Sequence, residues 1–558
     1  MMIILLLVMA RFLVAEAFCP VKCDCSKKDL LYCKDKSITD IAKIAIPHNF
    51  TFVRITDSQA VEVTDDSFQQ MPITLRLSLE SNLLSTVTPG AFHDFPLLKS
   101  LKLSNNALQS LPTGVFDMLI NLEQLFLDRN VLSYLDPHIF QNLRNLSELS
   151  LNRNLLKSLN KLSSLPKDIF SSLHELTTLL LYENLLTAII PLMFQNLTEL
   201  VKLNLHSNVI KVIDKDAFYH VPKLRELTLH KNCLQTLADG LFLYVNRLEA
   251  LTLYENPFTK FPNTLFGKMD YLKSLWLYNT SLSTLPNFIF TNLTNLESLI
   301  LTKNRNLHSL PSNTFSGLHR LVELYLHTNN FSALLEEPFQ DLPSLQVISL
   351  HNNKFDGVSE NFFKSLKNLE IVYLNNSNIM SLPGNIFKLV PTLKRVHLEG
   401  NPWVCDCRLQ YFKMWLVQNK EKVYNSTSLV CQSPSTLEGI PVLKTEELVC
   451  PYSTISMGDY YASLSPSPDS SLHRRTTPGE AVSSTVTAHT VSETSTSMTN
   501  TSLGWHLYTD KSSTSPSLLN VGITTEKTGT DLEERKRTWA SWERGKTCAG
   551  DPMPFQEH

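Results

Sequence analysis

Ten cysteines provide the most specific chemistry in this 558-residue chain. Eight of them fall into two tight clusters, made of Cys19, Cys23, Cys25 and Cys33, and of Cys405, Cys407, Cys431 and Cys450. Neither cluster has the paired C-x2-C spacing of common zinc modules, and an exported chain with an even number of clustered cysteines favours disulfides. We therefore expect four disulfides. Cys233 is expected to be unpaired within its own domain, and its pairing with Cys548 stays open.

Tyrosine, histidine and tryptophan side chains form a second group with binding chemistry. The candidates recur at a regular spacing and are Tyr182, His206, His230, Tyr254, Trp276, Tyr278, Tyr325, His327 and His351. Aromatic rings with polar edges suit a protein interface, because they combine large area with hydrogen-bonding tips. Two alternatives stay open. The rings stack on one another and contact water, or a histidine pair (His206 with His230, His327 with His351) binds zinc without a third ligand.

Catalytic and cofactor motifs are not found. The chain has no phosphate loop, no HExxH helix, no G-x-S-x-G elbow and no glycine-rich dinucleotide turn, and it contains only 16 glycines. Its formal net charge of −3 disfavours nucleic-acid binding by bulk electrostatics. We expect a binding protein for protein ligands, with no enzymatic activity, no cofactor and no nucleic-acid partner.

A repeated unit must position these residues. It has the pattern L-x-x-L-x-L-x-x-N-x-L-x-x-L followed by a turn and a Phe, and its Asn position is occupied by Asn82, Asn106, Asn130, Asn154, Asn184, Asn208, Asn232, Asn256, Thr280, Asn304, Asn329, Asn353, Ser377 and Asn401. Most steps are 24 residues, whereas Asn154 to Asn184 spans 30 and Asn304 to Asn329 spans 25. This is the leucine-rich repeat pattern.

The pattern predicts an α/β solenoid, or horseshoe, of about 15 repeats with a concave parallel β-sheet. The two leucines of L-x-L face the core, and the residues flanking them face outward, where the aromatic candidates lie. The consensus Asn is expected to satisfy buried backbone groups at the turn after each strand. A Phe column from Phe68 to Phe387 is expected to be core. The six extra residues Asn160 to Leu165 are expected to bulge on the surface.

Composition divides the chain into five parts. They are a signal peptide over 1–17, an N-terminal cysteine-rich cap over 18–50, repeats over 51–400, a C-terminal cysteine-rich cap over 401–452, and a disordered Ser/Thr-rich stalk with an unassigned tail over 453–558. The leader has an apolar run from Ile3 to Ala10 and a small-x-small site before Phe18. No later stretch approaches the ~20 apolar residues of a transmembrane helix.

Nine N-x-S/T sequons predict N-glycosylation, at Asn49, Asn145, Asn196, Asn279, Asn292, Asn330, Asn375, Asn425 and Asn500. Asn375 lies in the concave aromatic column itself. A glycan there would cover the C-terminal end of the concave face and confine a partner to the middle repeats, around Tyr254, Trp276 and Tyr278. The alternative is that the folded sheet hides Asn375.

The runs LEQLFLDRNVL, LTLYENPFTKFPNTLFGKMDYLKSLWLYNTSLSTLPNFIF and LILTKNRNLHSLPSNTF resemble the leucine-rich repeat glycoproteins of the platelet receptor complex, over roughly Cys19 to Pro451. The resemblance implies pairing of Cys19 with Cys25, Cys23 with Cys33, Cys405 with Cys431 and Cys407 with Cys450. It implies adhesion and haemostasis as the role, with platelet receptor subunits, von Willebrand factor, collagen and thrombin as partners. A thrombin-sensitive site is then expected at Arg474 and Arg475, for which the alternative is a solvated basic pair.

Near relatives of that family include the non-catalytic regulatory subunit of carboxypeptidase N. A secreted carrier that stabilises a plasma carboxypeptidase is therefore the alternative function. The expected location is secreted or on the extracellular face of the plasma membrane. The platelet glycoprotein that these repeats resemble is anchored by a transmembrane span after its stalk. The ending Arg535 to His558 resembles neither such a span nor a cytoplasmic tail. Membrane association is therefore expected only through partners. Whether this ending is real or comes from a wrong gene model stays open.

Overall fold

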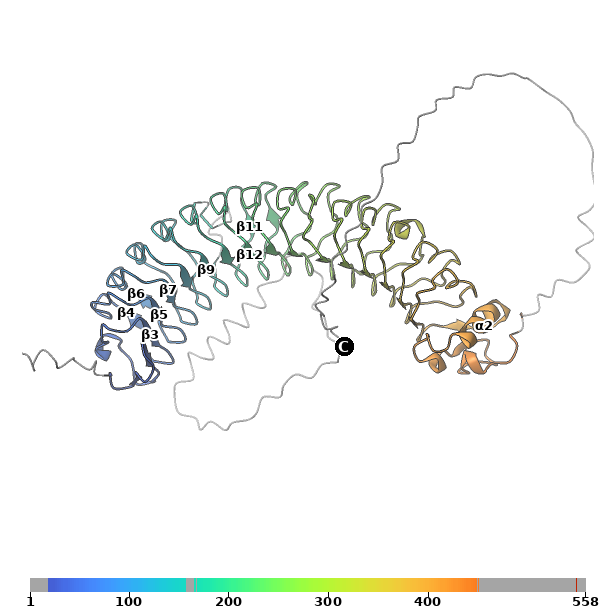
Figure 1. Ribbon diagram of the computed structural model, residues 1–558, viewed down its shortest axis with the longest axis horizontal. Helices are drawn as coiled ribbons and strands as arrows, with labels where there is room; N and C mark the ends of the chain where they lie inside the picture. Colours follow the sequence, from blue (N-terminus) through green and yellow to red (C-terminus); the bar gives the residue numbers. More distant parts are fainter. Residues whose placement is uncertain (1–18, 157–164, 167, 449, 451–547, 549–558) are drawn as a thin grey trace, which may run out of the picture. The chain divides into compact units, whose positions relative to one another are not determined.

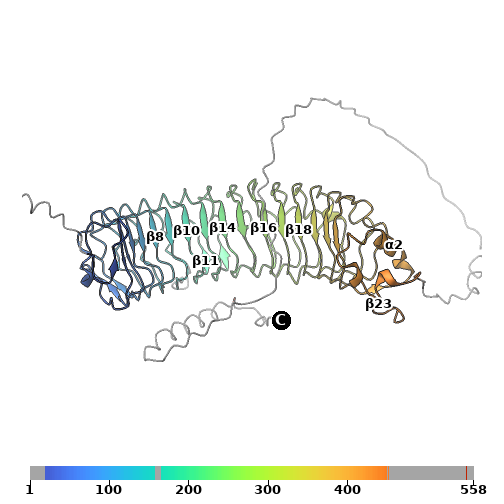
Figure 2. The same ribbon diagram turned by 60° about the horizontal axis from the view of Figure 1, so that its bottom comes forward.

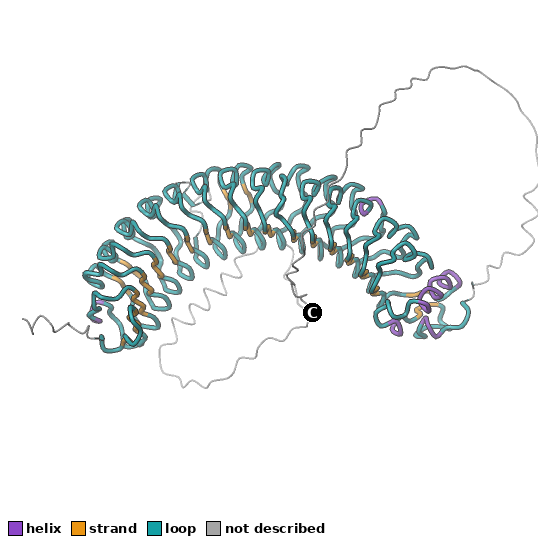
Figure 3. The backbone as a smooth tube through the Cα atoms, viewed as in Figure 1, coloured by secondary structure: helices purple, strands orange, loops and turns teal. Residues whose placement is uncertain are grey.

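The computed structural model describes residues 19–156, 165–166, 168–448, 450 and 548. The chain divides into two compact units, Met1–Pro451 with Lys546–His558, and Tyr452–Gly545. The second unit lies wholly outside the described residues, as do the leader, Arg474 and Arg475, Asn500 and most of the insertion. In the first unit the repeats follow one another along a curved path, with the strands on its inner side (Figures 1 and 3).

A 17-stranded sheet forms the inner layer. Its strands are β1 Cys23–Asp24, β2 Leu30–Cys33, β3 Phe52–Ile55, β5 Arg76–Ser78, β7 Ser100–Lys102, β8 Gln124–Phe126, β9 Glu148–Ser150, β10 Thr178–Leu180, β12 Lys202–Asn204, β14 Glu226–Thr228, β15 Ala250–Thr252, β16 Ser274–Trp276, β17 Ser298–Ile300, β18 Glu323–Tyr325, β19 Val347–Ser349, β20 Ile371–Tyr373 and β21 Arg395–His397. Figure 2 shows them side by side along the array.

The remaining elements are short. Three two-stranded sheets pair β4 Glu62–Val63 with β6 Thr86–Val87, β11 Ala188–Ile189 with β13 Val212–Ile213, and β22 Trp403–Val404 with β23 Cys431–Ser433. The helical segments are η1 Ala42–Ile44, η2 Glu337–Phe339, η3 Cys407–Leu409, α2 Gln410–Gln418, η4 Ser426–Ser428 and η5 Val442–Lys444.

The sheet keeps one register through the repeats. Every pairing is parallel except β1 with β2, and the middle residue of each repeat strand, such as Leu125, Leu149 and Leu179, is buried opposite its counterpart on the next strand. β9 and β10 pair in this register although the 30-residue step lies between them. The extra residues of that repeat therefore leave the sheet intact.

The consensus asparagines form a buried hydrogen-bonded ladder behind the strands. Asn130 Nδ2 donates to the carbonyls of Leu103 and Leu127, at 3.0 and 3.1 Å, and its Oδ1 accepts from the Leu108 amide at 3.1 Å. One carboxamide thus satisfies three backbone groups from two consecutive repeats that would otherwise be buried unpaired. At Thr280 the hydroxyl donates to Asn304 Oδ1 at 2.7 Å, which replaces only part of this pattern.

The residue before each ladder asparagine has left-handed backbone, and in most repeats it is not glycine. Arg129, Glu183 and Lys231 have φ of 55°, 53° and 56°. This conformation disfavours residues with a Cβ. The left-handed residue adds one more backbone hydrogen bond between consecutive repeats. The Arg129 amide donates to the Asn152 carbonyl at 3.0 Å, and the Lys231 amide donates to the Tyr254 carbonyl at 3.1 Å.

The outer layer consists of turns around a column of phenylalanines. Phe140, Phe170 and Phe194 are buried and stack with ring centroids 6.5 Å apart at each step, and the column ends against Trp415 of the C-terminal cap. Their burial agrees with the core position that the repeat spacing predicts for this phenylalanine column. The solenoid with a parallel sheet and disulfide-bonded caps confirms the predicted fold class, although turns and one 3-10 segment, rather than regular helices, cover the outside of the described repeats.

The caps close both ends of the core. Disulfides join Cys19 to Cys25 and Cys23 to Cys33 at the start, and Cys405 to Cys431 and Cys407 to Cys450 at the end. In the C-terminal cap, α2 buries Phe412 and Leu416 against the last repeat. The ends of the solenoid are thus covered, as a stacked array requires.

Candidate protein-binding face

The concave face carries a row of stacked rings. Three residues beyond the buried middle residue of each repeat strand, and two past the end of the strand, one side chain points outward on the concave face. Tyr182, His206, His230, Tyr254 and Tyr278 occupy this position in five consecutive repeats, and we call them the ring ladder. Successive centroids are 4.6, 4.4, 4.3 and 4.4 Å apart, with interplanar angles of 10° to 17°. The 24-residue repeat and the common register produce this stack.

Stacking determines what the ladder offers to a ligand. The inner rings His206, His230 and Tyr254 each have a ring on both sides, so their faces are covered and only their edges reach the concave surface. His206 Nδ1 lies 3.0 Å from Ser207 Oγ, and His230 Nδ1 lies 2.8 Å from Thr252 Oγ1. These hydroxyls fix the imidazole rings in the plane of the stack. The ladder is therefore a rigid surface of ring edges rather than a set of protruding aromatics.

The ladder histidine His230 is held neutral. Burial is the main cause that lowers its pKa to about 3, and the neighbouring His206 and Lys231 lower it further. Burial likewise raises the pKa of Tyr254 and of Tyr278. These three half-buried, neutral rings match the low-charge centre of a protein interface.

Trp276 is the exception to this arrangement. It is the last residue of β16, two residues before the ring-ladder position, and it lies between Thr252 of β15 and Ile300 of β17. Its ring meets Tyr254 edge to face at 6.4 Å and 63°, and the residue is 41% exposed. The largest open aromatic surface of the ring-ladder region is therefore the indole of Trp276, beside Tyr254 and Tyr278.

The stack is interrupted at Thr302 and resumes toward the C-terminus. Thr302 is small and buried, and His327 and His351 then stack at 4.2 Å. Burial lowers the pKa of His327 to about 4, with contributions from His351 and Lys303. Burial also lowers the pKa of His351. Tyr325, half-buried on β18, has its pKa raised to about 12 by burial and by Glu323.

Three further rings follow His351, which Tyr373 meets edge to face at 6.1 Å and 60°. The repeat spacing places Tyr373 and His397 in the outward column of Trp276 and Tyr325, and only Tyr424 lies outside the predicted columns. Tyr373 stacks on His397 at 4.4 Å, and His397 stacks on Tyr424 at 4.6 Å. Burial lowers the pKa of His397, opposed by Glu399. Tyr424 belongs to the C-terminal cap and reaches the stack because Val423 bridges to Val396 of β21. The 24-residue spacing gives no signal for a cap residue.

The paired histidines are poorly arranged to share a metal ion. Stacked imidazoles hold their nitrogens in parallel planes, so the lone pairs do not converge, and His327 Nδ1 lies 3.0 Å from Thr328 Oγ1. Among the described residues there is no group of three or more His, Cys, Asp or Glu side chains that could hold a metal.

Several sequon asparagines are engaged by the neighbouring repeat. Nδ2 of Asn145, Asn196 and Asn292 donates to the carbonyls of Ile120, Ser171 and Phe266, at 3.0, 2.9 and 2.9 Å. The remaining described sequons are Asn49, Asn279, Asn330, Asn375 and Asn425, of which Asn49, Asn279 and Asn425 are exposed. Within the described chain, the Asn375 Oδ1 atom is buried and has no hydrogen-bond partner.

Cys233 follows the consensus asparagine Asn232 and forms a disulfide with Cys548. Cys233 therefore has no disulfide partner within the described repeats. Its bond to Cys548 is the pairing that the sequence analysis left open. Cys233 is 4% exposed, whereas Leu83 and Val131, at the equivalent repeat position, are 38% and 39% exposed. Cys548 explains this difference because its sulfur covers that of Cys233.

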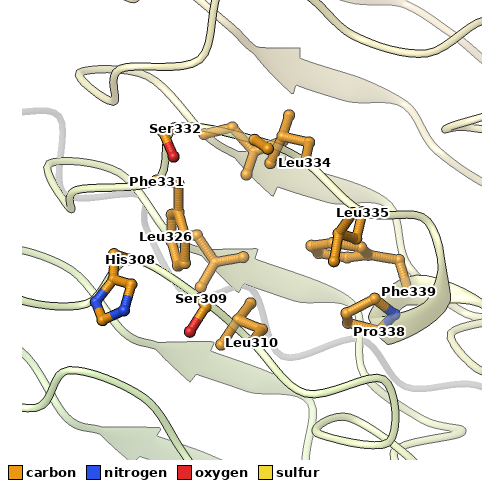
Figure 4. A pocket seen from close by; sticks show the side chains of 12 residues that line it. His308, Ser309, Leu310, Leu326, Phe331, Ser332, Leu334, Leu335, Pro338 and Phe339 are labelled. Atoms are coloured by element: carbon orange, nitrogen blue, oxygen red, sulfur yellow. The ribbon is translucent and has the colours of Figure 1, made fainter.

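One apolar hollow lies on the flank of the repeats, beyond the ends of the strands. Leu310, Phe331, Leu334 and Leu335 are among the residues around its volume of about 140 Å³ (Figure 4). It lies where the 25-residue repeat meets the next one, and the extra residue of that repeat falls between Asn304 and Leu307. No cluster of charged groups converges on it, and it is separate from the ring ladder.

A protein-family model described as leucine rich repeat matches the array. The matched segments are 51–108, 96–156, 158–210, 198–258, 270–331, 294–355 and 343–402. Two curated relatives are similar over short stretches. Carboxypeptidase N subunit 2 of Homo sapiens is 40% identical over 63 residues, and that of Mus musculus is 45% identical over 56 residues. These stretches cover 11% and 10% of this chain and 11% and 10% of the relatives, so the match spans about a tenth of their length.

Solved structures show the same architecture. The Toll–Spätzle complex of Drosophila superposes with a TM-score of 0.55 at 20% identity, over 75% of this chain and 71% of that one. A leucine-rich repeat protein of Leptospira interrogans superposes with a TM-score of 0.52 at 26% identity, over 68% of this chain and 90% of that one. In the described part of the chain, no helix has the length and apolar character needed to cross a membrane.

Proposed function

We propose that this chain, which belongs to the leucine-rich repeat family, is a non-enzymatic extracellular binding protein that recognises a protein ligand on its concave face. Its fold is typical of non-catalytic binding proteins, and its several disulfides indicate an oxidising, extracellular location. The observation that carries the proposal is the 41% exposed Trp276 beside the rigid, stacked ring ladder. A rigid aromatic anchor loses little conformational entropy on binding and is the usual centre of a binding hot spot.

The more specific proposal is an adhesion role. Resemblance of the repeats to platelet glycoprotein V supports a component of the platelet receptor complex for von Willebrand factor, with collagen as a further ligand and thrombin acting on Arg474 and Arg475. The alternative is a carrier subunit that stabilises a plasma carboxypeptidase. The short similarity to carboxypeptidase N subunit 2 supports this alternative.

The test is binding of Trp276→Ala and Tyr278→Ala variants to platelet receptor subunits, von Willebrand factor, collagen and the catalytic subunit of carboxypeptidase N. Truncating a central aromatic is expected to cost about 2 kcal/mol or more, a roughly 30-fold loss of affinity, for the true ligand. Tyr271→Ala is the matched control, because Tyr271 is exposed but does not belong to the concave columns. Circular dichroism establishes that each variant folds. Unchanged affinity for all four partners would dismiss the concave-face proposal.

A further inference from the structure

The N-terminal end of the concave face carries a cluster of cations that has no counterpart at the ring ladder. Arg54 on β3 and Lys102 on β7 occupy outward positions on the two strands that flank β5, and both are in register with Ser78 of β5. Arg76 lies two residues before Ser78 on the same strand, on the same face. The backbones of Arg54 and Lys102 are roughly 10 Å apart, two strand spacings. Three cations therefore surround one serine.

Two of these cations, Arg76 and Lys102, have no anionic partner among the described residues. Arg54 forms an ion pair with Glu80 at 2.5 Å. Arg76 and Lys102 instead lie over aromatic rings, of Phe52 at 5.9 Å and of Phe126 at 4.9 Å. In the part of the chain that is described, neither forms an ion pair with a carboxylate. Cation–π contacts of this kind are weak at exposed sites and leave the hydrogen-bond donors of both side chains available.

Ser78 supplies an independent indication of a ligand. It is 1% exposed although it occupies an outward position of the sheet, so the longer side chains around it must cover it. Among the described residues its Oγ atom is buried and has no hydrogen-bond partner. Buried hydroxyls are normally satisfied, because an unpaired one costs free energy. A negatively charged oxygen held between Arg76 and Lys102 would accept the hydrogen bond that this hydroxyl can donate.

We propose that Ser78, Arg76, Lys102 and Arg54 form a carboxylate-binding site, and that it takes a glutamate or aspartate side chain from an acidic, extended segment of a protein partner. Phe52 and Phe126 border the site and accommodate apolar residues two positions from the acidic one, which an extended segment presents on the same side. A polyanion such as a sulfated glycan or a nucleic acid fits less well. It needs a long run of cations, whereas the outward positions beyond Lys102 include Asp128 and Glu148, and the whole chain has a net charge of −3.

This site goes beyond the proposed function and does not depend on it. Its residues lie on β3, β5, β7 and β8, whereas the ring ladder follows β10 to β16. The two regions belong to one sheet, so a partner that extends along the concave face can contact both. The Trp276→Ala variant separates them, because it removes the proposed anchor and leaves every residue of the carboxylate site unchanged.

The test uses the full secreted chain and a fluorescein-labelled hexapeptide with glutamate at positions 1 and 5, phenylalanine at position 3 and serine at the other three positions, followed by fluorescence anisotropy. The matched probe has glutamines in place of the glutamates. We expect Arg76→Gln and Lys102→Gln each to weaken binding of the glutamate peptide about tenfold, since each removes a charge-assisted hydrogen bond. Ser78→Ala is expected to weaken it severalfold, and Arg76→Lys to restore most of the affinity. Binding should also weaken between about 50 mM and about 500 mM salt.

Controls make each outcome decisive. Lys202→Gln, which removes a concave cation already paired with Glu226 at 2.8 Å, should bind the peptide as the native chain does, and so should Trp276→Ala. Thermal melting of every variant shows that it folds. Equal affinity for the glutamate and glutamine peptides would overturn the proposal. Unchanged binding by folded Arg76→Gln and Lys102→Gln would overturn it as well, as would a heparin fragment that binds through these residues when the peptide does not.

Discussion

The His230 and Tyr254 rings lie face to face with their centroids 4.3 Å apart and their planes within 17°. In this contact the two rings cover each other's faces, so these faces are not available to the ligand that the sequence analysis expected them to bind. The alternative of mutually stacked rings therefore describes the geometry of the ladder, and the interface hypothesis rests mainly on Trp276 and the ring edges. Ligand recognition along the ladder would depend on rigidity and polar edges more than on buried aromatic area.

Acid should destabilise the repeats. The pKa of His230 is lowered to about 3 and that of His327 to about 4, against about 6.5 in the unfolded chain. Above pH 6.5 both states hold neutral imidazoles, and below it the unfolded state binds more protons, so stability falls as the pH drops. Melting temperature should fall from pH 6.5 to pH 5, before most carboxylates titrate. His230→Phe keeps the stack and should make this fall shallower; an identical slope would contradict the assignment.

Replacing one of the buried consensus asparagines should lower the free energy of unfolding. Asn232 Nδ2 donates to the carbonyls of Leu205 and Leu229, and its Oδ1 accepts from the Ile210 amide at 3.1 Å. Asn232→Ala leaves these buried groups unpaired, at about 1–3 kcal/mol for each. Denaturant titration should show a clear loss of stability. Asn306→Ala, at an exposed asparagine, is the control and should change little.

The C-terminal cap should depend on its disulfides. Cys405→Ser breaks the bond to Cys431, and loss of a native disulfide typically costs about 2–5 kcal/mol. The variant should melt at lower temperature and expose the last repeat to protease. Peptide mapping of the native chain without reductant checks the premise, and free thiols at Cys405 or Cys407 would refute it.

Shortening the 30-residue repeat should be tolerated. Deleting Asn160 to Leu165 restores the 24-residue spacing. Leu165 is buried, and after the deletion Leu159 stands directly before Pro166 and can fill the same position. β9 and β10 already pair in register, so the sheet needs no adjustment. The melting temperature should be nearly unchanged, and a large drop would show that the segment contributes to the core. If binding alone is lost, the segment contacts a partner.

The sequon at Asn375 should decide how far a partner can extend along the concave face. If it carries a glycan, Asn375→Gln should allow binding to include the C-terminal rings, and mass spectrometry of glycopeptides should find the site occupied. Asn375 is partly buried and its Oδ1 is enclosed, and both features oppose attachment of a glycan to the folded sheet. An unoccupied site in protein secreted from animal cells would remove this limit on the interface.

The repeat spacing was sufficient to predict the strands, the ladder asparagines and the phenylalanine column, because each depends on one residue type recurring at one position. Ring orientation was not predictable, since stacking depends on rotamers and on hydroxyls such as Thr252 that lie on another strand. Tyr424 was missed because it comes from a cap without the repeat spacing. Arg54, Ser78 and Lys102 share one outward column, but no residue type recurs there at the repeat spacing to mark them as a site.

The Cys233–Cys548 disulfide makes the segment between these residues a covalent ring, with a sequence separation of 315. A single cut in a ring opens it without dividing it. Proteolysis at Arg474 or Arg475 would therefore leave one molecule of unchanged mass, apart from the added water, and reductant would be needed to separate the pieces. In this chain the arrival of a protease and the release of a fragment are two distinct events.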